Sequence, residues 1–328
     1  MVVNWNRKEL LRACLLSLTR QSATGFETIV VDNGSTDGSA EMAEREFGAR
    51  VIRNHENRGF CAANNQGIDA AQGEFIALLN NDAEAEPAWL SELHAACASR
   101  AEIGMAASKI LVWEDPTRID KAGHLIFPDG QNRGRGTGDL DRGQYDREEE
   151  VLWPDGCAAM YRKSMLAEIG GFDEDFFAYA DDAELGLRAR IAGYRCLYTP
   201  RAVVRHHRGS TLGKGSVWRL TLIERNRVLL AAKLFPWSLL LLNPFYYALR
   251  LAAGALLAHG NEGDTVHFPG IGGKLRIAGA LLAGDFGALR LLPRILAKRA
   301  QIARFRKLPP REVRRLLLAH RLTLREVA

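Results

Sequence analysis

Residues 75–82 read FIALLNND, and this short stretch predicts how the N-terminal part of the chain folds. Five apolar residues are followed at once by three polar ones, which is typical of a buried strand that ends at the edge of a sheet. The same pattern occurs earlier, where TIVV at 28–31 is followed by Asp32. Because such strands alternate with helical stretches, we predict a mostly parallel α/β sheet with helices on both faces.

The predicted elements follow one another closely over the first hundred residues. Helices are expected at 9–18, 39–47, 62–71 and 88–99, and strands at 28–31, 50–52 and 75–79. In sheets of this kind ligands bind beyond the carboxyl ends of the strands, so Asp32 and Asp82 are expected near a ligand. Residues 128–150 are polar and glycine-rich, and they are predicted to form a long loop with little structure of its own.

The composition is that of a folded globular protein, with 47% hydrophobic and 25% charged residues in 328. It argues against disordered, collagen-like and coiled-coil chains. Five widely spaced cysteines form no CxxC pair, which argues against a zinc ribbon and a disulfide-rich secreted domain and favours a reducing compartment. Polar and charged residues at positions 4–9 do not fit a secretory signal.

The charge is distributed unevenly along the chain. Residues 219–328 hold 19 Lys and Arg against 6 Asp and Glu, whereas the first 218 residues hold 25 against 33. We therefore predict two domains, a catalytic one at 1–218 and a basic, apolar helical region at 219–328. The partner expected for the second is an anionic membrane surface and not nucleic acid, because stacking aromatics are scarce among its last arginines.

Residues 228–258 form the most apolar part of the chain, but charged residues and prolines interrupt them. An in-plane or re-entrant hairpin is therefore favoured, with one or two membrane-spanning segments as the alternative. The basic, amphipathic segment 290–327 is predicted to lie on a membrane surface, with a solvated helix as the alternative.

Three polar clusters in the first hundred residues could bind a ligand, and each also has a simpler interpretation. DNGSTDGS at 32–39 offers polar groups at a strand end, or only a strand–helix turn. NRGF at 57–60 places Arg58 near a helix N-terminus, as a phosphate contact or as a surface arginine. NND at 80–82 could hold a divalent cation, or form a turn.

Two further clusters could carry out catalysis. Asp181 and Asp182 begin a predicted helix, whose dipole keeps carboxylates ionised and suits them to act as a base, although helix capping is the alternative. His206 and His207 follow, and an imidazole could complete the coordination of a metal or could simply be a satisfied polar residue.

Taken in order, these clusters resemble the inverting glycosyltransferases of family 2, which have the GT-A fold, and are most similar to the rhamnosyltransferase-like branch that builds bacterial surface polysaccharides. The resemblance extends over roughly residues 1–230. Its elements are NWN at 4–6, DNGSTDGS at 32–39, NRGFCAANNQG at 57–67, LLNND at 78–82, GQYD at 143–146, DGCAAMYRKSMLAEIGGFDEDFF at 155–177, DDAELGLRARIAGY at 181–194 and HHRGS at 206–210.

The resemblance implies a role for each matching residue. Asp82 and His206 would bind Mg²⁺ or Mn²⁺, and Asp182, beside Asp181, would be the general base. Family members often have an acidic residue where this chain has Asn80, so a metal site with less negative charge is expected. The nucleotide-diphosphate sugar would be bound by Asn4, Trp5, Asn6, Asp32, Asn33, Ser35, Asn57, Arg58, Gly59, Asn64, Asn80 and Asn81.

The resemblance also implies an activity and a location. The activity is transfer of a sugar to a hydroxyl of a lipid-linked saccharide, with rhamnose from dTDP-rhamnose as the first choice and a UDP-sugar donor as the alternative. The location is the cytoplasmic face of the bacterial inner membrane. A nucleotidyltransferase of related fold and a degenerate GT-A membrane-binding module are the other classes considered. Few apolar residues precede 4–6, so we expect a short first strand or a start codon assigned late.

Overall fold

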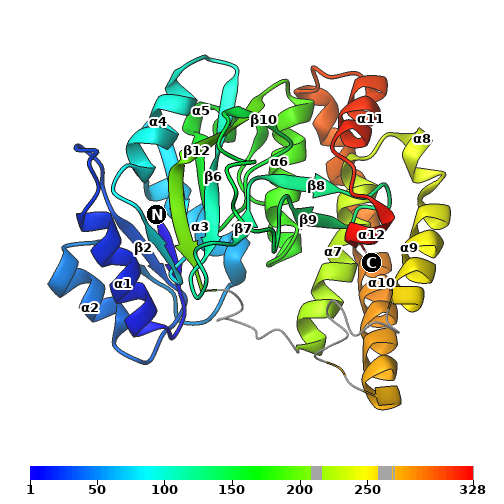
Figure 1. The fold of residues 1–328 in the computed structure, drawn as a ribbon, viewed down its shortest axis with the longest axis horizontal. Helices are drawn as coiled ribbons and strands as arrows, with labels where there is room; N and C mark the ends of the chain where they lie inside the picture. The colour runs from blue at the N-terminus through cyan, green and yellow to red at the C-terminus, as the bar shows by residue number, and fades with distance from the viewer. Residues whose placement is uncertain (208–215, 258–267, 269, 328) are drawn as a thin grey trace. The chain divides into compact units, whose positions relative to one another are not determined.

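The computed structural model describes residues 1–207, 216–257, 268 and 270–327 (Figure 1). The chain forms two compact units, the first made of 1–124 and 134–208 and the second of 125–133 and 209–328. The first unit contains most of the residues 1–218, which the sequence analysis predicted as one domain; the catalytic role of that domain stays a prediction. The short segment 125–133 belongs to the second unit, which was not expected from the sequence.

The first unit begins with three parallel strands that alternate with helices. The elements are β1 (Val2–Asn4), α1 (Lys8–Thr19), β2 (Ile29–Asp32), α2 (Ser39–Phe47), β3 (Arg50–Arg53) and α3 (Gly59–Ala70). β2 is buried along its whole length, as its apolar sequence predicts, and it pairs with β1 and β3. The register sets Asn4 level with Asp32, so the polar ends of the first two strands lie at one edge.

A second sheet of seven strands follows, and its pairing is mixed. Its strands are β4 (Phe75–Leu79), β5 (Ala83–Ala85), β6 (Ile103–Val112), β7 (Ile119–Lys121), β10 (Glu149–Val151), β11 (Ala158–Arg162) and β12 (Arg195–His206). Among the described strand pairs within this sheet, β6 and β12 are parallel and the others are antiparallel. The predicted α/β sheet is confirmed, but the mostly parallel arrangement holds only in part, because a buried apolar strand has the same sequence pattern in either orientation.

Backbone hydrogen bonds connect the two sheets through β1 and β4. The amino group of Met1 donates to the Ala77 carbonyl at 2.8 Å, and the Leu79 N–H donates to the Met1 carbonyl at 3.1 Å. These bonds have the slanted pattern of parallel strands. The carboxyl ends of β1, β2 and β4 therefore share one edge, where the sequence predicted a ligand.

Helices α4 (Trp89–Ala98), α5 (Lys163–Ile169) and α6 (Asp181–Ile191) complete the first unit (Figure 1). The core includes Leu11 and Leu15 of α1 and Trp89 and Leu93 of α4, all buried. All eleven residues of α6 are buried, so this helix runs through the interior and is not an amphipathic surface helix.

The predicted loop at 128–150 is more structured than its sequence indicates. β8 (His124–Ile126) and β9 (Asn132–Gly134) form a two-stranded sheet, and β10 lies at the far end of the segment. The prediction of little structure is therefore wrong at both ends. The strands NRG and EEV are three residues long and lack the apolar alternation by which strands are recognised.

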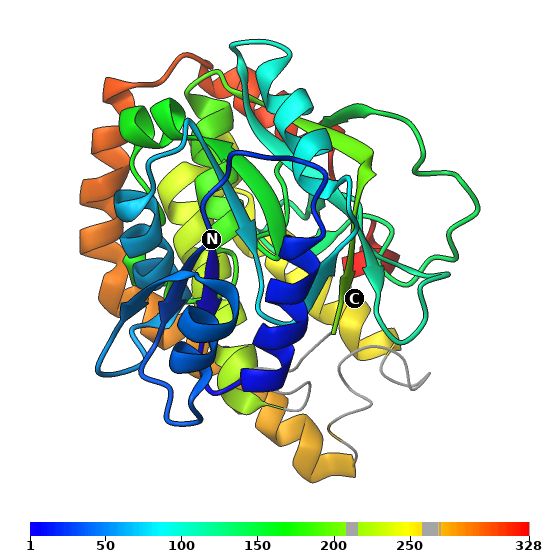
Figure 2. The ribbon, with the colours of Figure 1, turned by 90° about the vertical axis from the view of Figure 1, so that its left-hand side faces the viewer.

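The second unit is helical. Its helices are α7 (Val217–Leu234), α8 (Trp237–Leu240), α9 (Asn243–Leu257), α10 (Gly270–Gln301), α11 (Pro310–Ala319) and α12 (Leu324–Val327). The long helix α10 is drawn in orange in Figures 1 and 2 and packs along α7. In the part of the chain that the structure describes, no helix combines the length and the hydropathy needed to cross a bilayer.

Candidate active site

The two predicted metal ligands lie together. Asp82 comes three residues after β4, and His206 is the last residue of β12. The antiparallel pairing of β5 with β12 sets Ala83 opposite His206, which brings the adjacent Asp82 close. Nε2 of His206 lies 3.4 Å from Oδ1 of Asp82, and both residues are buried.

A third buried residue, Asp120 on β7, orients the imidazole. Oδ2 of Asp120 lies 2.7 Å from Nδ1 of His206, so Nε2 is the nitrogen that faces Asp82. A carboxylate that binds the outer nitrogen of a ligating histidine is a recurrent feature of metal sites. A carboxylate suits Mg²⁺ or Mn²⁺ and an imidazole suits transition metals, so of the two cations expected here this mixed donor set fits Mn²⁺ better than Mg²⁺.

The electrostatic surroundings of His206 favour positive charge. Burial alone would lower the pKa of His206, but contacts with Cys157, Asp120 and Asp82 raise this pKa well above that of an ordinary histidine. A divalent cation would benefit from the same carboxylates.

His207 does not share this site. Its ring stacks on Trp113, with the ring centroids 4.1 Å apart. Of the two histidines, His206 is therefore the one placed to bind a metal.

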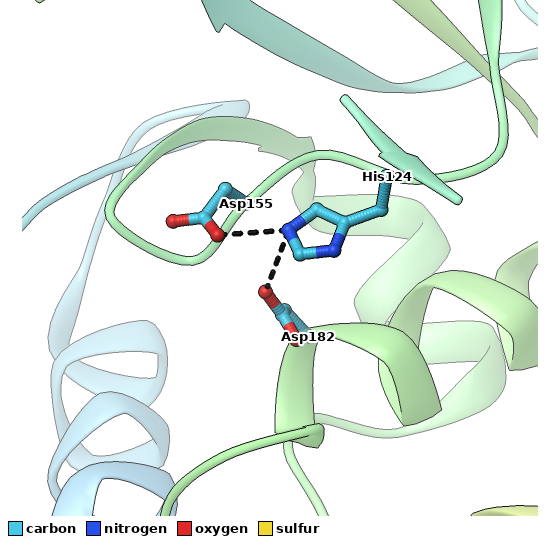
Figure 3. Close-up of side chains that lie close together, drawn as sticks. All are labelled: His124, Asp155 and Asp182. Atoms are coloured by element: carbon cyan, nitrogen blue, oxygen red, sulfur yellow. Dashed lines mark hydrogen bonds and ion pairs between the residues drawn. The ribbon is translucent and has the colours of Figure 1, made fainter. Parts of the chain in front are cut away.

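Asp182 belongs to a second buried group, which Figure 3 shows. Nε2 of His124 lies 2.8 Å from Oδ2 of Asp155 and 3.6 Å from Oδ2 of Asp182. The backbone N–H of Gly156 donates to Oδ2 of Asp182 at 3.2 Å. His124 Nδ1 is buried and has no hydrogen-bond partner among the described residues, which places the ring proton on Nε2, facing the carboxylates.

The three carboxylates of this region differ in their pKa. Burial would raise the pKa of Asp155, but Lys121 and His124 hold this pKa well below the usual range. Burial raises the pKa of Asp182, although His124 works in the opposite direction. Burial and then the neighbouring Asp182 raise the pKa of Asp181 well above its usual value. Asp155 is therefore expected to stay ionised, whereas Asp181 and Asp182 hold a proton more readily than ordinary aspartates. The expectation that the helix dipole keeps these two carboxylates ionised is not supported, because burial outweighs the dipole.

His124, Asp155 and Asp182 together offer three ligand atoms within 4.8 Å of one another, so they are a competing candidate for the metal site. However, Nζ of Lys121 lies 2.6 Å from the same Oδ2 of Asp155 that faces His124. This ammonium already neutralises Asp155 and would repel a divalent cation at close range. We therefore interpret the group as a charge network around Asp182, and Asp82 with His206 stays the other candidate for the cation site.

Two short segments connect the two groups. In the first, Asp120 contacts His206, whereas Lys121 contacts Asp155 on the other side. In the second, the N–H of Gly156 contacts Asp182, whereas the neighbouring Cys157 hydrogen-bonds with His206. The candidate cation ligands and the candidate base are therefore held by the same segments.

The position of Asp182 depends on an unusual backbone. Phe177, Tyr179 and Ala180 all have positive φ values, of 64°, 69° and 54°, immediately before α6. Such values are rare for residues other than glycine and cluster at functional sites.

Further along α6, a Cβ atom on Gly186 would lie 2.2 Å from Cβ of Trp153. The close approach of α6 to the segment before Asp155 therefore requires glycine at this position.

The predicted nucleotide-binding residues form two hydrogen-bonded groups at the strand ends. Asn4 donates to Asp32 at 3.3 Å and accepts from Asn81 at 2.8 Å, and all three are buried. Oγ of Ser35 accepts from the backbone N–H of Asn6 at 2.9 Å. Trp5, which lies between Asn4 and Asn6 in the sequence, is 38% exposed, and Asn80 is half-buried. One oxygen of Asp32 accepts from the N–H of Ser35, so this carboxylate also shapes the turn.

The second group lies at the start of α3. Asn33 donates to the Asn57 side chain at 3.3 Å and to the Gly59 carbonyl at 3.2 Å. Arg58 is exposed at the helix N-terminus, where an anion would be favoured. Asn64 instead donates to the Phe60 carbonyl one turn earlier in the same helix, so its amide group is partly engaged within α3.

Several residues of the site were not identified from the sequence. Asp120, Lys121, His124, Asp155 and Cys157 lie in the two connecting segments and carry the contacts described above. DGC at 155–157 was part of a quoted motif, but no chemistry was attached to it. The run IDKAGH at 119–124 carries no recognisable signal, because its function depends on pairing with strands far away in the chain.

Solved structures of similar fold identify the class of fold to which this α/β architecture belongs. A mannosyltransferase from Pyrobaculum calidifontis, in complex with GDP-Man and Mn²⁺, matches 88% of this chain and 85% of its own, with a TM-score of 0.53 and 19% identity. GalNAc-T7 with UDP, GalNAc and Mn²⁺ matches 94% of this chain and 57% of its own, with a TM-score of 0.59 and 14% identity. These similarities confirm the expected GT-A fold.

The chain belongs to glycosyl transferase family 2. The sequence model of this family matches residues 1–170, more than half of the chain, and that of glycosyl transferase family group 2 matches residues 144–260. The resemblance inferred from the ordered motifs is thereby confirmed.

Curated relatives share the same region. An uncharacterized protein of Sinorhizobium fredii is 30% identical over 62% of this chain and 24% of its own length, and the O-antigen biosynthesis protein RfbC of Myxococcus xanthus is 29% identical over 63% and 17%. The N-acetylglucosaminyl-diphospho-decaprenol L-rhamnosyltransferase of Mycobacterium tuberculosis is 27% identical over 62% of this chain and 74% of its own. The chain thus spans a quarter or less of the first two relatives.

Proposed function

We propose that this protein is a metal-dependent, inverting glycosyltransferase that transfers a sugar from a nucleotide-diphosphate donor to a hydroxyl of a lipid-linked saccharide. Family membership and the GT-A fold support a transferase that uses a nucleotide sugar. The single observation that carries the proposal is the joint positioning of Asp82, His206 and Asp182 by the segments 120–124 and 155–157.

Asp182 is the residue proposed to take the proton from the acceptor hydroxyl as its oxygen attacks the anomeric carbon. A raised pKa brings this carboxylate closer to the working pH, which makes proton transfer more favourable. The N–H of Gly156 and the ring of His124 hold its Oδ2 in place. The proton passes to the carboxylate as the bond to the leaving diphosphate breaks, so a single displacement inverts the anomeric carbon.

The opposite end of the reaction is a diphosphate that gains negative charge as it leaves. Arg58 at the N-terminus of α3 is proposed to contact it. Asp82 and His206 are proposed to hold Mg²⁺ or Mn²⁺, which would supply positive charge for the leaving diphosphate. Asn4, Asp32, Asn33 and their bonded neighbours are proposed to shape the nucleotide pocket.

Rhamnose from dTDP-rhamnose is the proposed donor, and a decaprenol-type lipid diphosphate sugar is the proposed acceptor class. The support is the relative from Mycobacterium tuberculosis, whose name specifies both an L-rhamnosyl group and a lipid-linked diphosphate. A UDP-sugar is the second choice of donor.

The test is a panel of nucleotide sugars assayed with and without Mn²⁺, with a lipid-linked saccharide as acceptor and the anomeric configuration of the product determined by NMR. The proposal predicts metal-dependent transfer from one donor, with inversion. Transfer with retention would exclude the proposed displacement, and folded protein that turns over no donor would indicate a degenerate module.

A further inference from the structure

Helix α10 buries its small residues and exposes its large apolar ones. The buried positions, apart from Ile295, are Gly273, Ala280, Gly284 and Ala288. Amphipathic helices of soluble domains normally have the opposite arrangement. We call the exposed apolar positions the outer stripe; they are Ile271, Leu275, Leu282, Phe286, Leu289 and Leu296.

The small residues on the inner side are explained by close packing on α7. A Cβ atom on Gly284 would lie 2.8 Å from Cβ of Glu224 and 2.8 Å from the carbonyl oxygen of Thr221. A larger side chain would therefore push the two helices apart. The large residues of the outer stripe have no such explanation, because they are exposed to between 44% and 80%.

The members of the outer stripe lie on one side of the helix. Their spacing of three, four or seven residues places them there, and the part from Ile271 to Leu289, before Pro293, extends for about 27 Å at 1.5 Å per residue. Soluble monomers rarely expose apolar patches of this extent without an interaction partner.

Cations border the outer stripe. Lys274, Arg276 and Arg290 are exposed on α10. The only acidic residue of α10 is Asp285, and its carboxylate is engaged with Tyr247 at 3.0 Å and Arg227 at 3.4 Å. An apolar strip flanked by exposed cations is complementary to a surface with an apolar interior and anionic headgroups. A second copy fits less well, because pairing two stripes would bring the same cations together.

The preceding helices show a similar distribution. In α8 and α9 the exposed apolar residues include Trp237, Leu241 and Phe245, each at least 63% exposed. The only charged residue between 236 and 257 is Arg250, and it points inward, where it binds Asp129 at 2.6 Å and Glu224 at 2.9 Å. The charge of this segment is thus buried, whereas part of its apolar surface is exposed.

We propose that the outer stripe of α10 docks the protein on an anionic membrane, with the helix lying in the plane of the surface. The inference extends the proposed function, because a lipid-linked acceptor would lie in that membrane, but it rests on the exposed residues of the second unit alone. The expected membrane contact is thereby assigned to residues 271–296, which overlap only the first residues of the segment predicted from the sequence at 290–327.

The test is co-sedimentation of the full chain with phosphatidylcholine vesicles that contain phosphatidylglycerol. Leu282→Ser/Phe286→Ser/Leu289→Ser is expected to lower vesicle binding by about tenfold or more, because three apolar side chains are lost. The matched control, Leu16→Ser/Phe26→Ser/Leu140→Ser, removes the same residue types from exposed positions of the first unit and should bind as the wild type does. Equal binding by the stripe variant and the wild type would overturn the proposal.

The role of the flanking cations is tested separately. Lys274→Gln/Arg276→Gln/Arg290→Gln is expected to weaken binding by about fivefold per residue on vesicles with phosphatidylglycerol, and to change little on phosphatidylcholine alone. Equal losses on both kinds of vesicle would contradict an electrostatic contribution.

The oligomeric state is measured by light scattering without lipid. If the wild type is a dimer and the serine variant is a monomer, the stripe binds another copy of the chain and the proposal is overturned.

A third variant guards against misfolding. Phe286→Trp should fold normally, because the site is exposed, and brominated lipid should quench its added fluorescence but not that of Leu16→Trp. Equal quenching of the two would overturn the proposal.

Failure of this inference is distinguished from failure of the proposed function by assaying transfer to a water-soluble acceptor. The serine variant should retain that activity while losing vesicle binding.

Discussion

Oδ2 of Asp120 lies 2.7 Å from Nδ1 of His206, and this contact turns Nε2 of the ring toward Asp82. The contact joins the middle of β7 to the end of β12, two strands that each pair with β6. If His206 binds a cation, Asp120 fixes which nitrogen does so.

The first prediction follows from this contact. Asp120→Asn should weaken the activation of the enzyme by Mn²⁺ by about 10- to 100-fold, because residues behind a metal ligand typically contribute that much to metal affinity. The measurement is the Mn²⁺ concentration that gives half-maximal donor hydrolysis. Asp69→Asn, at an exposed position of α3, is the control and should behave as the wild type.

The same titration distinguishes the two candidate metal sites. His206→Ala should raise the Mn²⁺ requirement more than His124→Ala does, because Lys121 neutralises the carboxylate beside His124. The reverse order would place the metal at His124, Asp155 and Asp182.

The second prediction concerns pH and stability. Burial and Asp182 raise the pKa of Asp181 in the folded protein, so the folded state binds more protons than the unfolded state between the two pKa values. Stability is therefore lost as the pH rises through that window. Asp181→Asn should raise Tm at neutral pH, and the difference should disappear once the pH is below the pKa of the unfolded aspartate. A lower Tm for the variant at neutral pH would show that the charged carboxylate stabilises the fold.

The third prediction concerns Gly59, which has a φ of +84° and would place a Cβ atom 2.5 Å from the ring of Phe177. Gly59→Ala should cost about 1–3 kcal/mol for the strained backbone, and more for the displaced ring. It should also weaken donor binding. The Phe177 carbonyl accepts the N–H groups of Phe60 and Cys61, so displacing Phe177 would disturb the start of α3, where the donor is proposed to bind.

Gly48→Ala is the control for the backbone alone, since Gly48 has a φ of +62° and open space around its Cβ position. Chemical denaturation should show the smaller loss for this variant, and calorimetry should show unchanged donor affinity. Equal losses of stability would mean that the contact with Phe177 contributes nothing.

The fourth prediction concerns the buried charges of the second unit. Asp129 is fully buried, and its Oδ2 is 2.6 Å from Nε of Arg250 and 3.8 Å from Arg227. Arg250→Ala should destabilise this unit by about 3–5 kcal/mol, because it removes the close partner of Asp129 and leaves Arg227, at 3.8 Å, as the remaining cation beside this buried carboxylate. Arg314→Ala, at an exposed position of α11, should change stability by less than about 0.5 kcal/mol. The stability of each variant is measured by chemical denaturation, with hydrogen exchange of the backbone amides of α9 and α10 as the probe.

The sequence predicted the elements of the first hundred residues well, since their apolar runs and helical spacing are strong local signals. Its limits appear at β7 and at the segment 155–157. Asp120, Lys121 and His124 acquire a role only because β7 pairs with β6, which in turn lies beside β12. Such proximity depends on the order of strands in the sheet, and local periodicity does not contain it.

α10 illustrates a different limit. The sequence shows apolar residues among basic ones, but a hydrophobic pattern does not reveal which side of a helix packs inward. In the structure the small residues face α7 and the large ones face outward, so the exposed surface became visible only with the fold. The membrane interaction itself stays a prediction.

The most direct test of the account compares Asp182→Asn with Asp82→Asn. Asparagine at 182 still accepts the Gly156 N–H, so this variant should bind the nucleotide sugar with Mn²⁺ as the wild type does. Its transfer rate should fall by roughly 10²- to 10⁴-fold, as expected for loss of a general base. Asp82→Asn should lose Mn²⁺-dependent donor binding as well as transfer. The decisive measurement is donor affinity by calorimetry together with the single-turnover transfer rate for both variants. Intact binding with lost transfer in the first, and loss of both in the second, is the predicted result; wild-type transfer by Asp182→Asn would contradict the account.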